Sequence, residues 1–304
     1  MVIEGLINSI FFGLISGSIY AFVVIGYSLI YSVLGFINFA HGDLLAVGVY
    51  LCWVIGEGYI GIPFFIAIII AALLTGILSS MIGFFILIPT NKRYPIATLV
   101  VAIGVSIIIQ NLISLTCTSE ARPFYSNIKF ENFSYIPVNY LHISILITST
   151  LTLLTLWFGL LKKTKLGLKI RACASNPVAS FIFGLQRNRI FGFVFFISGI
   201  LAALSGIAKG LDDQIINPTI GFSLGIRAFI ASVIGGITNI WGAIAGAFIL
   251  GIIEHMSIFF MLTIPILKPL SLILSKDAIA LILLIIILFW KPKGIFALTY
   301  ESRP

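Results

Sequence analysis

The stretch Gly35-Phe36-Ile37-Asn38-Phe39-Ala40-His41-Gly42-Asp43 carries an amide, an imidazole and a carboxylate in an otherwise apolar region. At the depth of a lipid bilayer, such groups need protein, water or a solute to satisfy their hydrogen bonds. Two glycines in the same stretch disfavour an unbroken helix. We therefore interpret Gly35–Asp43 as a break in a membrane-spanning element that lines a path.

The composition around this break is that of an integral membrane protein. The 304 residues are 60% hydrophobic and 9% charged, with a mean hydropathy of +1.18, whereas a soluble domain has about 25% charged residues. The apolar runs exceed about 18 residues and lack strand-like alternation, which predicts helices rather than barrel strands. No part resembles a separate soluble domain, so residues 1–304 are predicted to form a single transmembrane domain.

Two features of the chain argue against processing and against metal binding. The start, Met1–Glu4, lacks a basic segment, so a cleaved signal peptide is not expected. The three cysteines, Cys52, Cys117 and Cys173, are scattered and predict neither a disulfide framework nor a metal site.

Nine apolar segments are candidates for crossing the membrane, and we predict an all-α, polytopic fold with eight to ten transmembrane helices. Segment 36–56 contains the break, and segment 223–240 contains Arg227 and a Gly-Gly pair, so we expect discontinuous or re-entrant helices among them. The nine segments are 6–33, 36–56, 62–88, 96–117, 143–161, 191–211, 223–240, 241–265 and 277–290.

The basic residues predict the orientation, because cytoplasmic connections carry an excess of Lys and Arg. If all nine segments cross, twelve of the eighteen basic residues lie on one face: Lys92, Arg93, Lys162, Lys163, Lys165, Lys169, Arg171, Arg187, Arg189, Lys291, Lys293 and Arg303. The opposite face collects the acidic residues Glu57, Glu120, Glu131, Asp212, Asp213 and Asp277. We predict an N-terminus outside and a C-terminus in the cytoplasm.

Asp43 has two interpretations. It precedes an apolar run from Leu44 to Ile55, and a carboxylate at a helix start can accept free backbone N–H groups near the positive end of the helix dipole. Alternatively, Asn38, His41 and Asp43 face a solute path or gate near the inner membrane face. Both interpretations can hold together.

A second break occurs at Ile216-Asn217-Pro218-Thr219-Ile220-Gly221-Phe222. Both breaks contain Ile-Asn followed by a glycine four residues after the Asn. Paired breaks in the two halves of a transporter often mark a pathway at a repeat interface. This raises the hypothesis of a two-half repeat with Asn217 on the path, but an ordinary outer loop is equally consistent with the sequence.

Arg227 and Glu254 are the charged pair predicted inside the membrane. A rise of about 1.5 Å per residue puts them at similar depths in a core about 30 Å thick. Because an unpaired charge there is costly, we predict a structural ion pair between adjacent segments rather than two solute ligands.

Four glycine pairs have the GxxxG spacing that permits close helix approach: Gly13/Gly17, Gly206/Gly210, Gly221/Gly225 and Gly242/Gly246. Chance accounts for most of them in a chain with 28 glycines. We expect them only to be packing contacts.

The connection 162–190 contains seven basic residues and no acidic one. Within it, Asn176-Pro177 can start a short amphipathic helix and Gly184 can end it. A soluble partner's groove or an anionic lipid surface would suit this helix equally well.

Motifs for enzymatic chemistry are missing from the sequence. There is no phosphate-binding loop of the Gly-x-x-x-x-Gly-Lys-Ser/Thr type, no Gly-x-Ser-x-Gly and no His-Glu-x-x-His. We therefore expect no catalytic residue, no cofactor or metal bound to this chain and no nucleic-acid partner. Any energy for transport must come from an ion gradient or from another polypeptide.

Several motifs resemble, in preserved order, those of permeases in high-affinity branched-chain amino acid ABC importers. Ile37–Asp43 is similar to the INFAHG-[DE] signature of that family. The resemblance continues through Gly17-Ser18-Ile19-Tyr20-Ala21, Gly26–Tyr31, Arg171–Ala174 with Ala179 and Gly184, Ile216–Phe222, Ala231–Gly236, Gly242–Glu254 and Pro292–Ile295. It covers nearly the whole chain.

The resemblance implies a permease subunit of the inner membrane that imports branched-chain or related aliphatic amino acids by alternating access. It implies as partners a second permease subunit (a paralogue or a second copy), two cytoplasmic ATPases that bind ATP and Mg²⁺, and a periplasmic substrate-binding protein. The implied ATPase contact in the loop 162–190 comprises Arg171, Ala172, Asn176, Ala179 and Gly184. Urea, short amides or other amino acids are alternative solutes, and a gradient-driven secondary transporter is the alternative class.

Overall fold

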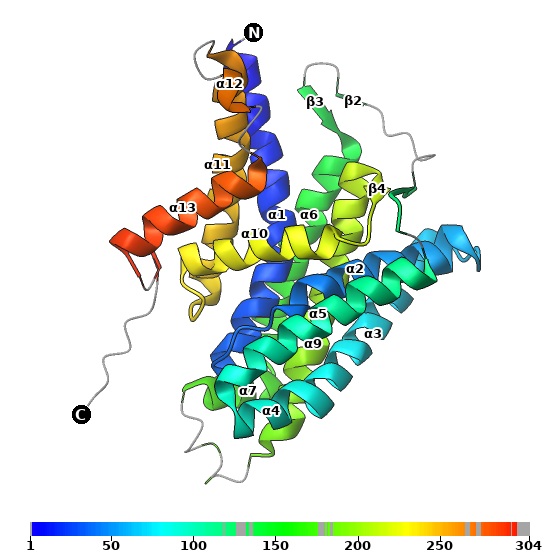
Figure 1. The fold of residues 1–304 in the computed structure, drawn as a ribbon, viewed down its shortest axis with the longest axis vertical. Helices are drawn as coiled ribbons and strands as arrows, with labels where there is room; N and C mark the ends of the chain where they lie inside the picture. Colours follow the sequence, from blue (N-terminus) through cyan, green and yellow to red (C-terminus); the bar gives the residue numbers. More distant parts are fainter. Residues whose placement is uncertain are drawn as a thin grey trace.

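The computed structural model describes residues 2–117, 119–125, 132–133, 136–175, 180, 182, 185–264, 268–271, 275–292 and 294–296. These residues form an all-α fold with two short strand pairs, as predicted (Figure 1). The α-helices are α1 (Val2–Leu34), α2 (Ala40–Trp53), α3 (Phe64–Ile82), α4 (Ile88–Arg93), α5 (Pro95–Thr116), α6 (Tyr140–Leu154), α7 (Lys165–Ser175), α9 (Arg187–Asp213), α10 (Ile220–Gly235), α11 (Ile240–Thr263), α12 (Lys268–Ser271) and α13 (Lys276–Trp290). Three π-helical segments, Val54–Gly58, Gly83–Leu87 and Thr155–Lys162, extend α2, α3 and α6.

Six helices among the described residues are long and apolar enough to cross a membrane: Ile3–Leu34, Phe64–Arg93, Pro95–Thr116, Tyr140–Gly159, Asn188–Asp213 and Ile240–Thr263. The other three predicted segments correspond to α2, whose 14 residues continue into the π-helical segment Val54–Gly58, and to the shorter helices α10 and α13, of 16 and 15 residues. A core of about 30 Å takes about 20 helical residues, so α10 and α13 differ from simple spans.

The long helices differ in how much of their surface the protein covers. α1 and α9 are mostly buried and form the centre, with α11 and α9 packed against α1 and with α3 packed against α9. α3, α5 and α6 leave most of their apolar side chains exposed, for example Phe65, Ile96 and Leu151. Lipid requires this arrangement, in which the outer surface is apolar and the polar groups are buried with apolar side chains in the core.

Glycine contacts bring the central helices together. A Cβ on Gly13 would lie 2.6 Å from the Cα of Ile252, and one on Gly17 would lie 2.8 Å from the Cα of Phe248, so α1 and α11 touch backbone to backbone. The other three GxxxG pairs also lie at crossings of α-helices. The predicted packing role of these glycines is therefore confirmed.

Two short antiparallel pairs join the connections at one end of the molecule. β1 (Arg122–Pro123) pairs with β4 (Ile215–Ile216), and β2 (Asn132–Phe133) pairs with β3 (Ile136–Asn139). The N-terminus, β2, β3 and α12 lie at the upper end in Figure 1, and α4 and α7 lie at the lower end. The connections around residue 92 and in 162–190 thus share one end of the protein. The sequence analysis predicted this from their excess of Lys and Arg.

The basic connection contains a helix that the sequence analysis did not predict. Residues Lys165–Ser175 form α7, with Gly167, Ile170 and Cys173 buried. The amphipathic helix predicted after Asn176 falls mainly outside the described residues.

Candidate functional site

The predicted break begins where α1 ends. Gly35 has a positive φ of 72°, and its N–H donates a 2.8 Å hydrogen bond to the carbonyl oxygen of Tyr31. This left-handed conformation caps a helix end and favours glycine. Helix α2 starts at Ala40, so Gly42 and Asp43 lie in its first turn rather than in the break.

The carboxylate of Asp43 joins α2 to α5. It accepts hydrogen bonds from the hydroxyl of Ser106 and from the side-chain amide of Gln110, the latter at 3.0 Å, and only 1% of the residue is exposed. The position before α2 is Phe39, which makes no side-chain cap. Asp43 lies in the first turn of α2, near the positive end of the helix dipole as predicted, but the hydrogen bonds that it accepts come from α5 and not from the free backbone N–H groups of its own helix.

Asn38 and His41 are buried polar side chains that lack hydrogen-bond partners among the described residues. Their exposed fractions are 1% and 0%, and neither the amide atoms of Asn38 nor the ring nitrogens of His41 form a hydrogen bond. The His41 ring packs edge-on against Tyr27, with centroids 4.9 Å apart, and against Gly26, where a Cβ would overlap it. Unsatisfied groups of this kind are costly in a packed interior.

The two sequence breaks meet in space. Gly42 and Gly221 each lie four residues after the asparagine of a break, and each touches the backbone of the other helix. A Cβ on Gly42 would lie 2.8 Å from the oxygen of Gly221, and a Cβ on Gly221 would lie 2.7 Å from the oxygen of Gly42. The crossing of α2 and α10 therefore joins the segments that the sequence singled out separately.

α10 presents different residues on its two sides. Gly221 and Gly225 face α2, with Gly42 between them. Thr219, Ser223 and Arg227, spaced by four residues, share the other side of the helix. That side lines a mainly polar pocket of about 410 Å³ together with Asn217, so Asn217 lies beside a cavity whereas Asn38 is enclosed.

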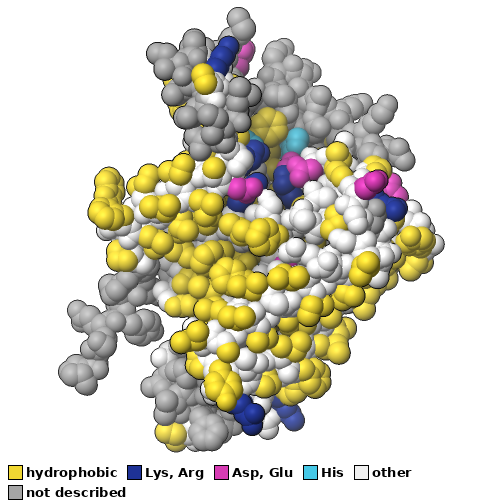
Figure 2. Space-filling view, in the orientation of Figure 1, with side chains coloured by type: hydrophobic (Ala, Val, Ile, Leu, Met, Phe, Trp, Pro, Cys, Tyr) yellow, Lys and Arg dark blue, Asp and Glu magenta, His cyan; other side chains and the backbone are white. Residues whose placement is uncertain are grey.

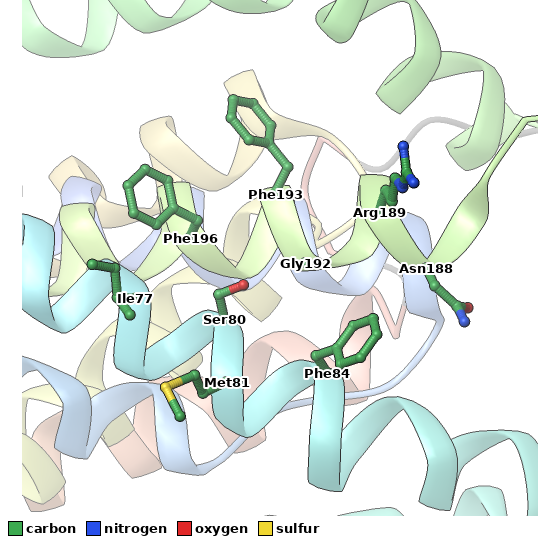
Figure 3. A pocket seen from close by; sticks show the side chains of 9 residues that line it. All are labelled: Ile77, Ser80, Met81, Phe84, Asn188, Arg189, Gly192, Phe193 and Phe196. Carbon is green, nitrogen blue, oxygen red and sulfur yellow. The ribbon is translucent and has the colours of Figure 1, made fainter.

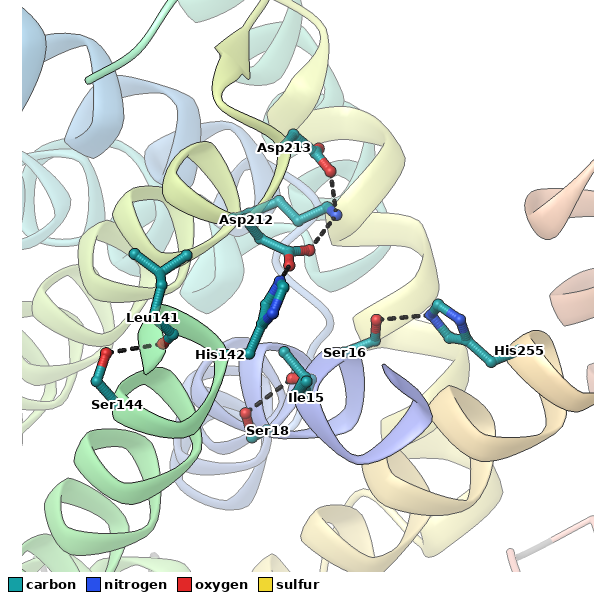
Figure 4. A network of polar contacts seen from close by, with 10 residues as sticks. Ile15, Ser16, Ser18, Leu141, His142, Ser144, Asp212, Asp213 and His255 are labelled. Atoms are coloured by element: carbon teal, nitrogen blue, oxygen red, sulfur yellow. Dashed lines mark hydrogen bonds and ion pairs between the residues drawn. The ribbon is translucent and has the colours of Figure 1, made fainter. Parts of the chain in front are cut away.

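A network of charged side chains lies beside this pocket, at the C-terminal end of α9. Lys209 Nζ is 3.0 Å from Asp212 Oδ2 and 2.7 Å from Asp213 Oδ1, and Asp212 Oδ1 is 3.3 Å from His142 Nε2 on α6 (Figure 4). His255 Nε2 lies 2.9 Å from the hydroxyl oxygen of Ser16. Figure 2 shows basic, acidic and histidine side chains gathered in one region of a mostly apolar face.

The ion pair predicted between Arg227 and Glu254 takes a different form. Arg227 Nε lies 2.6 Å from Asp277 Oδ1 at the start of α13, and Glu254 Oε2 accepts a 2.7 Å hydrogen bond from the hydroxyl of Tyr20. Arg227 attracts Glu254 only at longer range. Equal depth in the membrane did not decide the partner, because α13 brings a closer carboxylate to Arg227 and α1 brings a hydroxyl to Glu254.

The opposite end of the molecule carries two pockets beside the basic connection. One, of about 420 Å³, lies between α3 and α9 and is lined by Ile77, Ser80, Met81, Phe84, Asn188, Arg189, Gly192, Phe193 and Phe196 (Figure 3). The other, of about 500 Å³, lies between α7 and α9. Arg171 and Ala172 belong to α7, whereas Asn176, Ala179 and Gly184 lie outside the described residues.

Several polar residues of the site were missed by the sequence analysis. Ser106 and Gln110 are four residues apart on α5, so a search for polar side chains on one face of an apolar helix could have found them. Lys209, Asp212 and Asp213 have the spacing of helical ion pairs. Nothing in the sequence indicated that His142 joins them, because α6 is distant in the chain.

Comparison with known proteins gives matches over nearly the whole chain. The model of a family described as "Branched-chain amino acid transport system / permease component" matches residues 9–288. The high-affinity branched-chain amino acid transport system permease proteins LivH of Salmonella typhimurium and of Escherichia coli K12 are each 32% identical over 303 residues, which is 95% of this chain and 94% of theirs. The corresponding protein BraD of Pseudomonas aeruginosa is 32% identical over 301 residues, covering 93% of both chains.

Proposed function

The chain belongs to the family of permease components of branched-chain amino acid transport systems, and we propose that it moves branched-chain or related aliphatic amino acids across the inner membrane. Its family and its membrane-spanning helices make it a multi-pass inner-membrane protein. The observation that carries the proposal for this chain is the crossing of the two broken segments at Gly42 and Gly221.

This crossing has the properties of a gate. Its central contact, at Gly42 and Gly221, is backbone on backbone. Beside it the rings of Phe39 and Phe229 pack edge to face, with centroids 5.6 Å apart. Asn38 and His41 lie next to it with unsatisfied polar atoms, which would gain partners when the packing opens. A bistable helix contact of this kind suits alternating access, in which one packed arrangement replaces another.

Energy for transport would come from partner subunits. The permease family implies a second permease, two cytoplasmic ATPases holding ATP and Mg²⁺, and a periplasmic binding protein, with no catalytic step on this chain. We assign the ATPase contact to the connection 162–190, where α7 and the neighbouring pocket between α7 and α9 supply basic and apolar side chains, including Lys169, Leu166 and Arg189.

Reconstitution into proteoliposomes tests this function. The complex with ATPase, second permease and binding protein is expected to accumulate L-leucine only when ATP is supplied inside the vesicles. Uptake by this chain alone, driven by a proton or sodium gradient, would make it a secondary transporter. ATP-driven uptake of urea, short amides or other amino acids in place of leucine would retain the class and change the solute.

A substitution in the connection tests the contact with the ATPase. Ala179→Asp is expected to weaken co-purification of the ATPase while leaving membrane insertion intact, because it adds a carboxylate to a connection whose charged residues are all basic. Ala121→Asp, at an exposed position in the connection at the other end of the molecule, serves as the matched control. Equal recovery of the ATPase with both variants would contradict the assignment.

A further inference from the structure

The pocket beside Asn217 has a lining that distinguishes it from the rest of the apolar surface. Its volume of about 410 Å³ lies within the range of small-molecule sites, which is about 300–1,000 Å³. The lining comes from α9, α10, α13 and the connection before α10, and consists of Lys209, Asp213, Asn217, Thr219, Ile220, Ser223, Leu224, Arg227 and Lys276.

The three cations of this lining, Lys209, Arg227 and Lys276, are not all paired directly with a carboxylate. Lys209 has the carboxylates of Asp212 and Asp213, and Arg227 has that of Asp277. Lys276 lines the same cavity and forms no hydrogen bond or ion pair in the part of the chain that the structure describes, although Glu254 and Asp212 attract it at longer range. A half-buried ammonium group without a direct partner in such a place favours an anionic ligand.

Neutral donors face the same space. The hydroxyl of Thr219 donates a 3.1 Å hydrogen bond to Asn217 Oδ1, which leaves the amide N–H groups of Asn217 free to donate elsewhere. Ser223 lies one helical turn further along α10. The positive end of the dipole of α10, which begins at Ile220, adds to the attraction of an anion.

From this geometry we infer that the pocket binds the carboxylate of the transported solute, with Lys276 as the cationic partner and Asn217 and Ser223 as hydrogen-bond donors. This inference rests on the proposed function, because it takes the solute to be an amino acid. α10 then carries the solute site on one side and the contact with Gly42 on the other. Binding in the pocket can therefore bias the α2–α10 crossing through a single rigid helix.

Thiol labelling of the purified permease complex tests the charge preference of the pocket directly. In a background with Cys117→Ser, Ser223→Cys places a thiol in the lining, and Thr219→Cys serves if that variant does not fold. The anionic sulfonatoethyl methanethiosulfonate is expected to react about threefold or more faster than the cationic trimethylammonioethyl reagent. Lys276→Gln should abolish this preference, whereas Lys268→Gln, at an exposed position of α12, should retain it.

Protection of the introduced thiol by small carboxylates tests the pocket independently of the transport function. L-leucine and 4-methylpentanoate are expected to slow the labelling, and leucinol, which lacks the carboxylate, is not. Equal rates for the two reagents, or a preference that survives Lys276→Gln, would overturn the inference even if the complex transports leucine. Protection by 4-methylpentanoate in a complex that fails to transport leucine would retain the carboxylate site and overturn the proposed function.

Discussion

The polar side chain of His41 lies where it does because a small residue, Gly26, leaves space for it. The imidazole is fully buried on α2, and it occupies space that Gly26 leaves open on α1. Its neighbour Asp43 is held by Ser106 and Gln110 of α5. Side chains only two positions apart on α2 therefore have different roles: the carboxylate is satisfied and structural, and the imidazole retains two unpartnered nitrogens.

Gly26→Ala is expected to destabilise the protein by about 1–3 kcal/mol, because a Cβ there overlaps the His41 ring and the core must shift. Gly104→Ala is the control, since a Cβ on Gly104 has no heavy atom within 4 Å outside its own helix. The thermal unfolding midpoint in detergent measures both. His41→Ala in the Gly26→Ala background should recover part of the loss, and an unchanged midpoint for Gly26→Ala would contradict the packing described here.

The charged pairs inside the protein predict which double-mutant cycles show coupling. We expect coupling of about 0.5–1 kcal/mol between Arg227→Gln and Asp277→Asn, because 45% of the Asp277 side chain is exposed and solvent screens the pair. The cycle of Tyr20→Phe with Glu254→Gln should also show coupling. Unfolding midpoints of the single and double variants give these values, and the largest coupling between Arg227 and Glu254 would reinstate the pair that the sequence predicted.

At the scale of elements, α2 and α10 are the pair on which the site depends. Both follow a break, α10 is shorter than a membrane-spanning helix, and the closest contacts of their crossing are between Gly42, Gly221 and Gly225. The long helices α1 and α9 supply the buried framework around them. α2 also packs against α3, α5 and α9, and α10 packs against α1, α11 and α13, so a shift at the crossing is passed on to these neighbours.

Gly225→Ala tests the crossing. Its Cβ would lie 2.7 Å from the Cα of Gly42, so α2 and α10 must separate to accommodate it. We expect leucine uptake by the complex to fall about tenfold or more, equivalent to about 1.4 kcal/mol, while the amount of protein in the membrane is retained. Gly192→Ala, whose Cβ would lie 3.4 Å from the Ser80 hydroxyl oxygen, is the matched control; similar uptake by both variants would show that the crossing does not limit transport.

At the scale of the whole molecule, the two ends have different chemistry. The end with α4 and α7 carries basic connections and the pockets lined by Arg189, whereas the end with β1 and β4 carries the network of Lys209, Asp212 and His142. By the positive-inside rule, we propose that the first end is cytoplasmic. In this proposed orientation the carboxylate pocket would face the side from which a binding protein would deliver solute.

Cysteine labelling of intact cells tests this orientation. With the native cysteines replaced by serine, Glu57→Cys and Glu120→Cys are expected to react with a membrane-impermeant thiol reagent, because the proposed orientation puts their connections outside. Lys92→Cys and Lys169→Cys should react only after the cells are opened. Labelling of Lys169→Cys in intact cells would reverse the proposed orientation.

The sequence by itself determined the class of fold, the apolar segments, the position of both breaks and the family. These properties depend on local composition, on glycine and on short motifs, so they can be read from neighbouring residues. The sequence also raised the hypothesis that Asn38 and Asn217 belong to related segments.

Only the tertiary structure decided which polar groups meet. It paired Asp43 with α5 instead of its own helix start, Arg227 with Asp277 instead of Glu254, and Gly42 with Gly221. It also joined Lys209, Asp212 and His142 from two helices and opened a cavity beside Asn217. Partner choice depends on distances between helices far apart in the sequence, because a hydrogen bond or ion pair forms only at short range. Neither depth in the membrane nor residue spacing along one helix specifies these distances.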